Sequence, residues 1–284
     1  MIELLQQSPL LAGGYVFLVG LLVGSFLNVV AHRLPRMMER EWKAEAQAIL
    51  SGSPQEPSAS PPAYNLVVPR SACPACGHKI TALENIPVIS WLVLRGRCSA
   101  CKTRISARYP VVELATALLS LLVFLILGAT PQTLLALPLT WALISLTLID
   151  FDTQLLPDQI TLPLLWAGLL VNIEGMFVPL HAAVIGAMLG YLILWSVYWL
   201  FKLLTGKEGM GYGDFKLLAA LGAWLGWMQV PVILLLSSVV GSIIGIGYLI
   251  VRRESAPFAF GPYIAIAGFI ALLWGVPLVS WYLG

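Results

Sequence analysis

The sequence predicts an all-α polytopic membrane protein with about eight transmembrane helices and a small cytoplasmic zinc-binding domain between helices 1 and 2. Of its 284 residues, 59% are hydrophobic and only 11% are charged, and the mean hydropathy is +0.87. A soluble domain carries about 25% charged residues. The apolar runs are long enough to cross a bilayer as helices. The net charge of +2 and the lack of a basic tract outside one polar loop give no sign of nucleic-acid binding.

Eight apolar segments follow one another along the chain, and each is expected to form one helix. The N-terminus lacks the basic region and cleavage site of a signal peptide, so the first span is expected to be retained. The turn between the short sixth span and the seventh is expected at Val230-Pro231, and seven spans with one kinked helix are the alternative. The expected spans are residues 13–32, 109–128, 132–150, 159–177, 181–203, 215–228, 229–251 and 261–283.

Positive charges orient these spans, because loops on the cytoplasmic side of a membrane carry an excess of Lys and Arg. With the N-terminus outside, all 16 Lys and Arg residues fall in or beside inside loops. Merging the sixth and seventh spans would move Arg252 outside, so the charges favour eight spans. The same layout places four aspartates at the inside face: Asp150, Asp152, Asp158 and Asp214.

The chain is expected to have three parts. Residues 1–35 form the first helix, residues 36–107 a cytoplasmic domain, and residues 108–284 the membrane core. Within the domain, residues 37–50 are expected to form a short polar helix. The Pro/Ser-rich residues 51–63 are expected to form a flexible linker.

The four cysteines of the chain all lie in one compact unit, expected at about residues 70–104. They are Cys73, Cys76, Cys98 and Cys101. Two such Cys-x2-Cys pairs predict a structural zinc site, in which four thiolates leave no position for a catalytic water. The metal would supply folding energy that so short a segment lacks. His78 is either a substitute ligand or a bystander, and two unligated or redox-sensitive pairs are the alternative.

Two aspartates stand where a long apolar segment meets a short polar turn: Asp150 in Leu-Ile-Asp-Phe-Asp and Asp214 in Gly-Tyr-Gly-Asp-Phe-Lys. Such a carboxylate is costly at the edge of a bilayer and usually marks a functional site. Asp150 also ends a helix, where the dipole disfavours an anion. Helix capping remains an alternative for Asp214 and Asp158, and Asp152 is either functional or a solvated turn residue.

A facing pair of carboxylates predicts acid–base chemistry. The two groups share one proton, so the ionised carboxylate can take a proton from water while the protonated one polarises a scissile carbonyl. Such a reaction needs no metal and no covalent intermediate. Lys216, two residues after Asp214, either favours the ionised form of that carboxyl or extends to the membrane surface.

Further segments complete the pattern. They include Gly-Ser-Phe-Leu-Asn-Val-Val-Ala-His-Arg-Leu-Pro at 24–35 and the residues 73–80, 85–98, 105–113, 150–158, 211–216 and 260–263. Together these segments closely resemble the type IV prepilin peptidase family, which comprises bifunctional leader peptidases and N-methyltransferases with a Gly-x-Gly-Asp aspartyl site. The resemblance covers nearly the whole chain.

The resemblance implies an aspartyl endopeptidase of the bacterial cytoplasmic (inner) membrane, with its active site and zinc domain at the cytoplasmic face. Its substrates would be type IV prepilins and type II secretion pseudopilins, cleaved after a Gly. The new N-terminal residue, usually Phe, would then be methylated with S-adenosylmethionine. The family's catalytic pair matches Asp150 and Asp214, and Gly96 and Arg97 match positions tied to methyl transfer.

Several other polar residues near the inner face have two interpretations. Asn28, His32 and Glu113 either form hydrogen bonds between helices or line the substrate cleft. The full set of candidate cleft-lining residues is Asn28, His32, Glu113, Asp152, Asp158 and Lys216.

Two other functions account for parts of the sequence. A transporter would share the spans and the intramembrane acids, but it predicts acids near the bilayer centre, and here they cluster at one face. A scaffold whose zinc unit docks a partner leaves Asp150 unexplained.

Overall fold

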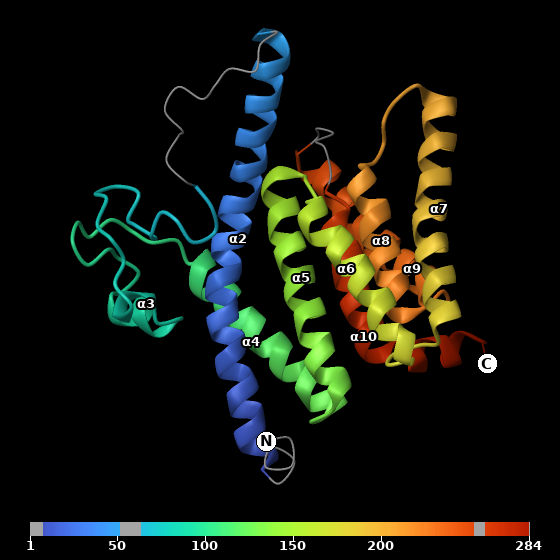
Figure 1. The fold of residues 1–284 in the computed structure, drawn as a ribbon, viewed down its shortest axis with the longest axis horizontal. Coiled ribbons are helices and arrows are strands. Elements are labelled where there is room, and N and C mark those ends of the chain that lie inside the picture. The colour runs from blue at the N-terminus through green and yellow to red at the C-terminus, as the bar shows by residue number, and fades with distance from the viewer. Residues whose placement is uncertain (1–7, 52–63, 253–258, 284) are drawn as a thin grey trace. The chain divides into compact units, whose positions relative to one another are not determined.

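The computed structural model describes residues 8–51, 64–252 and 259–283, which are helical apart from connections and two isolated β-bridges (Figure 1). The chain divides into two compact units, Met1–Leu122 and Val123–Gly284. In chain order the elements are α2 (Pro9–Ser51), η1 (Leu83–Asn85), α3 (Ile89–Val93), α4 (Arg108–Leu127), α5 (Pro131–Thr153), α6 (Asp158–Val171), η2 (Asn172–Glu174), α7 (Leu180–Thr205), α8 (Tyr212–Leu225), α9 (Gln229–Arg252) and α10 (Gly261–Leu283).

The predicted all-α polytopic membrane fold is confirmed. Among the described residues, six helices are long and apolar enough to cross a membrane: α2, α4, α5, α7, α9 and α10. The other two predicted spans correspond to α6 and α8, which have 14 residues each. At about 1.5 Å per residue they are about 21 Å long, shorter than a hydrocarbon core of about 30 Å.

Three boundaries differ clearly from the sequence prediction, one of them at the fourth span, which was expected to reach residue 177 whereas α6 ends at Val171. The first helix does not end near residue 32: α2 continues to Ser51 and includes the segment 37–50, which is rich in Ala and Glu and favours helix. The expected turn at Val230-Pro231 is wrong, because α8 ends at Leu225 and Pro231 is the third residue of α9, where its missing N–H costs no helical bond. The predicted linker 51–63 lies outside the described residues, except for Ser51.

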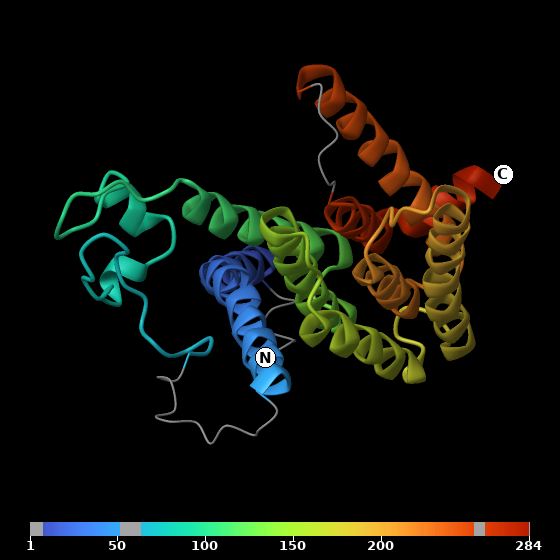
Figure 2. The same cartoon turned by 90° about the horizontal axis from the view of Figure 1, so that it is seen from above.

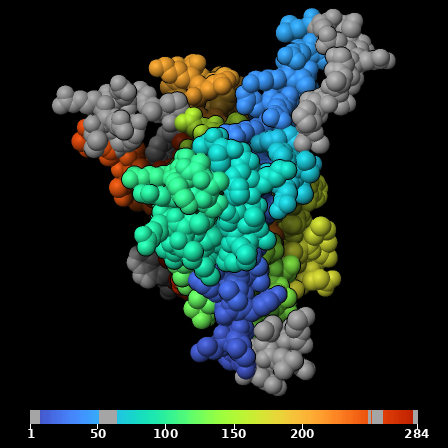
Figure 3. Space-filling model, turned by 90° about the vertical axis from the view of Figure 1, so that its left-hand side faces the viewer, coloured from blue at the N-terminus to red at the C-terminus, as the bar shows by residue number. Residues whose placement is uncertain are grey.

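In the first unit, α2 and α4 approach each other closely at two glycines. A Cβ on Gly20 would lie 2.7 Å from the Cα of Ala117, and one on Gly24 would lie 2.7 Å from the Cα of Glu113. Small residues of this kind let membrane helices pack backbone to backbone. Residues 64–107 pack together as one contiguous group next to α2 (Figure 3).

Arg33 of α2 ties that segment to the helix. Its guanidinium donates to the carbonyl oxygens of Asn65 (3.0 Å) and Pro69 (2.6 Å), and the side chain is only 8% exposed. The Tyr64 ring lies 4.0 Å from the guanidinium carbon of Arg40, which adds a cation–π contact. Arg33 thus holds the start of the segment 64–107 against α2.

In the second unit, α8 is the central helix. All its residues from Asp214 to Leu225 are buried except Lys216. Figures 1 and 2 show α8 surrounded by α6, α7, α9 and α10. A helix that is apolar on all sides is expected in such a position. The burial of α8 fixes the location of Asp214 within the unit.

Asn172 joins the ends of three helices. This fully buried side chain donates to the carbonyl oxygens of Ala223 (2.9 Å) and Trp224 (3.0 Å) at the end of α8. It also accepts from the backbone N–H groups of Phe177 (3.0 Å) and Val178 (3.1 Å), just before α7. Four backbone groups without helical partners are satisfied by one amide.

Replacing Asn172 with Leu is expected to destabilise the protein by several kcal/mol, because each buried polar group left unsatisfied costs about 1–3 kcal/mol. Thermal unfolding in detergent measures the change. The matched control is Glu174→Gln, an exposed substitution in the same connection. Equal stability of the two variants would contradict this role for Asn172.

Candidate active site

Asp150 and Asp214 come together at one end of the second unit. Asp150 lies in the last turn of α5 and is 4% exposed, and Asp214 lies in the first turn of α8 and is 7% exposed. Their carboxylates are close enough to repel each other when both are ionised. The α5–α6 and α7–α8 connections lie at the same end of the unit in Figure 1. The structure therefore brings these two side chains together, and their role as a catalytic pair stays a prediction.

The start of α10 supplies the third element of this site. The backbone N–H of Gly261 faces the Asp150 carboxylate, and a Cβ on Gly261 would lie 2.5 Å from Asp150 Oδ2. Oδ2 is buried and has no hydrogen-bond partner among the described residues. A buried acceptor without a partner is costly, which supports a chemical role for Asp150.

Asp214 does not cap α8. The helix begins at Tyr212 and its N-cap is Gly211, which makes no side-chain capping bond. Asp214 is the third helical residue, so the capping alternative from the sequence is wrong. Its carboxylate makes no capping hydrogen bond at the start of α8, and its position is set by the buried helix that carries it.

Asp158 and Lys216 form an ion pair between α6 and α8. The Nζ atom of Lys216 donates to both carboxylate oxygens of Asp158, at 2.7 and 2.8 Å. The N-cap of α6 is Pro157, so Asp158 does not cap it. The side chain of Lys216 is 27% exposed and that of Asp158 is 50% exposed. An ion pair at such a position contributes at most about 1 kcal/mol to stability. Lys216 is thus engaged by Asp158 beside the site, and Asp152 lies exposed on α5.

The four cysteines also converge, in the first unit. Their Sγ atoms all lie within 4.8 Å of one another, and those of Cys73 and Cys101 are 3.7 Å apart. Tetrahedral zinc with Zn–S bonds of about 2.3 Å places its sulfurs about 3.8 Å apart. The cluster therefore has the geometry to hold one metal ion.

His78 lies outside this cluster. Its Nε2 atom is 3.2 Å from Glu84 Oε1 and 3.3 Å from Ser99 Oγ. Hydrogen bonds from Ser99, and then from Thr81, lower the pKa of Glu84 to about 2. His78 therefore contacts the ionised carboxylate of Glu84 and not the cysteine cluster. This fits the interpretation of His78 as a bystander to the metal site.

Comparison with known proteins identifies the family. Residues 18–127 match the model of the bacterial peptidase A24 N-terminal domain, and residues 137–246 match that of the type IV leader peptidase family. The chain belongs to the type IV leader peptidase family. The second match contains both Asp150 and Asp214, and the first contains the cysteine cluster. The resemblance drawn from the sequence motifs is confirmed.

Relatives in this family align along the whole chain. A prepilin leader peptidase/N-methyltransferase of Aeromonas salmonicida (strain A449) is 62% identical over 100% of this chain and 98% of its own length. The proteins of that name from Aeromonas hydrophila and Pseudomonas aeruginosa are 62% and 57% identical, again over 100% of this chain, and over 98% and 97% of their own lengths. No solved structure matches.

Gly96 and Arg97, which the family resemblance ties to methyl transfer, lie in a tight turn. Gly96 has a positive φ of 65°, and a Cβ there would lie 2.8 Å from the Trp91 ring. Trp91 in turn donates from Nε1 to the carbonyl of Ile105 (3.2 Å). Gly96 is therefore required by the fold as well, and Arg97 is exposed beside it.

Asn28 makes the hydrogen bond between helices that one interpretation predicts, whereas Glu113 bonds to a residue outside the helices. Asn28 Nδ2 donates to the carbonyls of Gly24 (3.2 Å) and Tyr109 (3.3 Å), so it joins α2 to α4. Glu113 accepts from the backbone N–H of Val88 at 2.7 Å. His32 lies exposed on α2. A cleft-lining role for these residues stays a prediction.

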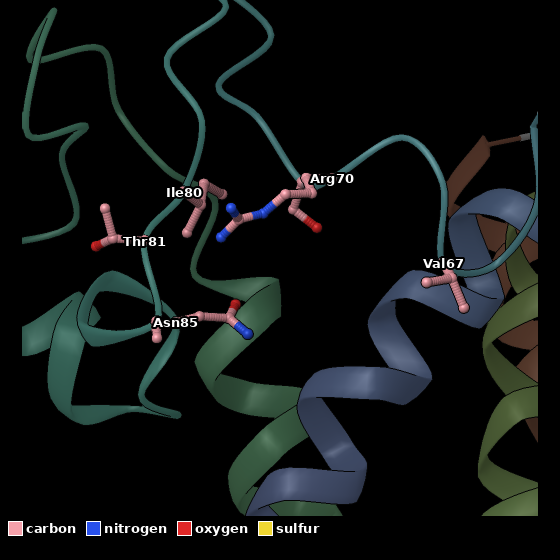
Figure 4. Close-up of a pocket in the computed structure, with 7 residues that line it drawn as sticks. Val67, Arg70, Ile80, Thr81 and Asn85 are labelled. Atoms are coloured by element: carbon pink, nitrogen blue, oxygen red, sulfur yellow. The ribbon is translucent and has the colours of Figure 1, made fainter. Parts of the chain in front are cut away.

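A pocket of about 220 Å³ lies on the segment 64–107 (Figure 4). The guanidinium of Arg70 and the amide of Asn85 point toward the same space in this view. The lining residues are Val67, Arg70, Ser71, Ile80, Thr81, Ala82 and Asn85. Gly96 and Arg97 do not line it, so the predicted methyl-transfer pair and this pocket are separate features.

Proposed function

We propose that this protein cleaves the leader peptides of type IV prepilins and type II secretion pseudopilins after a Gly, and then N-methylates the new N-terminal residue, usually Phe. The observation that carries the proposal is the buried pair of Asp150 and Asp214 beside the backbone of Gly261. The pair lies in a chain whose close relatives carry both activities in their names.

The two carboxyls perform the cleavage as an acid–base pair. The ionised carboxylate takes a proton from a water molecule, and the oxygen of that water attacks the scissile carbonyl. The protonated carboxyl donates its proton to the carbonyl oxygen, which gives a tetrahedral intermediate. Collapse of this intermediate breaks the C–N bond and transfers a proton to the leaving amine.

The membrane setting supports this substrate class. The chain is a multi-pass membrane protein, and we place it in the bacterial inner membrane with the N-terminus outside. The active site and the zinc domain then face the cytoplasm. A prepilin helix in the bilayer would bring the end of its leader to the depth of Asp150 and Asp214. The charge pattern and the shared end of α5 and α8 support this arrangement.

Two further components complete the proposal. One structural Zn²⁺ per chain would be held by the four cysteines, whose donor set and spacing suit that ion. S-adenosylmethionine would supply the methyl group for the new N-terminal amine. Gly96 and Arg97 are the residues we propose for methyl transfer, with Gly96 also shaping the turn in which they lie.

The test of both activities is incubation of a purified prepilin with the purified protein, followed by mass analysis of the product N-terminus. We expect a cleaved product without S-adenosylmethionine, and the same product carrying one added methyl group when it is present. An uncleaved prepilin would contradict the peptidase assignment. Ion flux in liposomes without cleavage would instead support the transporter alternative.

The zinc proposal predicts the zinc content of the wild-type protein and of its cysteine variants. The wild-type protein should contain one zinc per chain, and Cys73→Ser should lose most of it, because three thiolates no longer fill the tetrahedral shell. Elemental analysis of purified protein measures the content. The control is His78→Ala, which should retain zinc because His78 contacts Glu84 and Ser99. Equal zinc in wild type and Cys73→Ser, or none in the wild type, would refute the site.

A further inference from the structure

Leu156 contacts the backbone on both sides of the aspartate pair. It lies in the connection between α5 and α6. A Cβ on Gly213 would lie 2.7 Å from Leu156 Cβ, and a Cβ on Gly261 would lie 3.0 Å from Leu156 Cδ1. Gly213 directly precedes Asp214, and Gly261 faces Asp150. One apolar side chain therefore lies near Asp150 and against the residue that precedes Asp214.

The position of Leu156 is fixed by the residues around it. Gln154, the C-cap of α5, has a left-handed conformation with φ 56°, and its N–H donates to the carbonyl of Asp150 at 2.9 Å. Pro157 is the N-cap of α6, is buried, and has a φ restricted by its ring. Leu156 is thus held between two helix ends rather than in a free loop.

The space around the glycines is already full. A Cβ on Gly213 would lie 2.7 Å from Leu156 Cβ, which is fixed to the backbone, so this position needs glycine. A Cβ on Gly261 would lie 2.5 Å from the Asp150 carboxylate and would have to displace it. Leu156 is half-buried, whereas both carboxylates are almost completely buried. A substrate carbonyl that reaches the carboxylates must therefore bring its own residue against Leu156. A side chain on that residue would then meet the end of the Leu156 side chain, whose Cδ1 atom lies on the Asp150 side of the site.

We propose that Leu156 is a specificity-determining residue, which restricts the substrate residue before the scissile bond to one with little or no side chain. The inference rests on the proposed peptidase function and names the group that sets its substrate preference. Glycine satisfies the restriction, and alanine would place a methyl group against the Leu156 side chain.

The test compares two prepilins that differ only in having Gly or Ala before the scissile bond. The measured quantity is the ratio of kcat/KM for the Gly substrate to that for the Ala substrate. In Leu156→Ala this ratio is expected to fall at least about tenfold, since one methyl group in an apolar pocket changes kcat/KM about 10- to 200-fold. Leu156→Val, which keeps most of the packing, should give an intermediate ratio and decides the question if the Ala variant does not fold.

Leu155→Ala is the matched control. It removes the same side chain one position earlier, and the leucine atoms close to the two glycines come from Leu156 rather than from Leu155. Its ratio should equal that of the wild type. An unchanged ratio in active Leu156 variants, or an equal change in Leu155→Ala, would overturn the inference alone. Failure of the wild type to cleave the Gly substrate would overturn the proposed function and this inference with it.

Discussion

Asp150→Asn and Asp214→Asn are each expected to reduce cleavage of a prepilin on the order of 10³-fold or more, as removal of a member of a catalytic unit does in other proteases. Each variant keeps the size of the side chain but cannot exchange the proton that the mechanism requires. The two carboxylates act as one unit, so the double variant should lose little more than either single variant. Cleavage rates with purified protein and prepilin measure the effect.

The variants should keep their fold and their second activity. Asn is neutral and nearly isosteric, and replacing a buried carboxylate removes a group that is costly to bury when charged. The unfolding temperature should therefore be unchanged or higher. Methylation of a pilin that is already cleaved should also persist, because the residues proposed for methyl transfer, Gly96 and Arg97, belong to the first unit.

Asp152→Asn is the control, because it makes the same change at a neighbouring aspartate of α5. Asp152 is exposed two residues beyond Asp150, so its replacement should leave cleavage near the wild-type rate. Full cleavage by Asp150→Asn or Asp214→Asn would contradict the assignment of that residue. If Asp152→Asn or Asp158→Asn then lost activity, the catalytic pair would have to be reassigned.

The sequence predicted what depends on local pattern. Apolar length located the long helices, and the Cys-x2-Cys spacing predicted a four-cysteine cluster that the structure brings together. The dipole argument singled out Asp150, whose Oδ2 atom proves to be buried without a hydrogen-bond partner. The sequence left helix capping open for Asp214, because the answer depends on where α8 begins. The glycines before Asp214 do not fix that residue, which the structure shows to be Tyr212.

The rest depends on contacts between distant segments. Gly261 and Leu156 enter the site because α8, α10 and the α5–α6 connection meet there, and neither residue has a local signal of its own. Asn172 resembled an ordinary loop residue until its four backbone partners were known. One missed feature did have a signal: Gly186 and Gly190 form a Gly-x-x-x-Gly pattern, which favours close helix packing in membranes.

Gly222 of α8 packs against Gly186 of this pattern. We therefore expect Gly222→Ala to disrupt the fold around Asp214, which is the second large effect. A Cβ on Gly222 would collide with the carbonyl oxygen and carbon of Gly186 in α7. A Cβ on Gly190 would likewise lie 2.6 Å from the carbonyl oxygen of Leu218 in α8. The two helices touch through their backbones, which cannot move aside as a flexible side chain would.

The methyl group should therefore force α7 and α8 apart. Overpacking usually costs about 1–3 kcal/mol, and a collision with backbone belongs at or above the upper end of that range. Because α8 is buried on all sides and carries Asp214, its displacement should also separate the two carboxylates and abolish most cleavage. Thermal unfolding and the cleavage rate together measure the two consequences.

Gly247→Ala in α9 is the control, because a Cβ at that position meets nothing within 4 Å. It makes the same chemical change in a helix of the same unit and should leave stability and cleavage nearly unchanged. If Gly222→Ala were as stable and active as Gly247→Ala, the close α7–α8 contact would not be needed to position Asp214. If Gly222→Ala lost cleavage but still methylated a pre-cleaved pilin, the damage would be confined to the second unit, as the backbone contact between α7 and α8 requires.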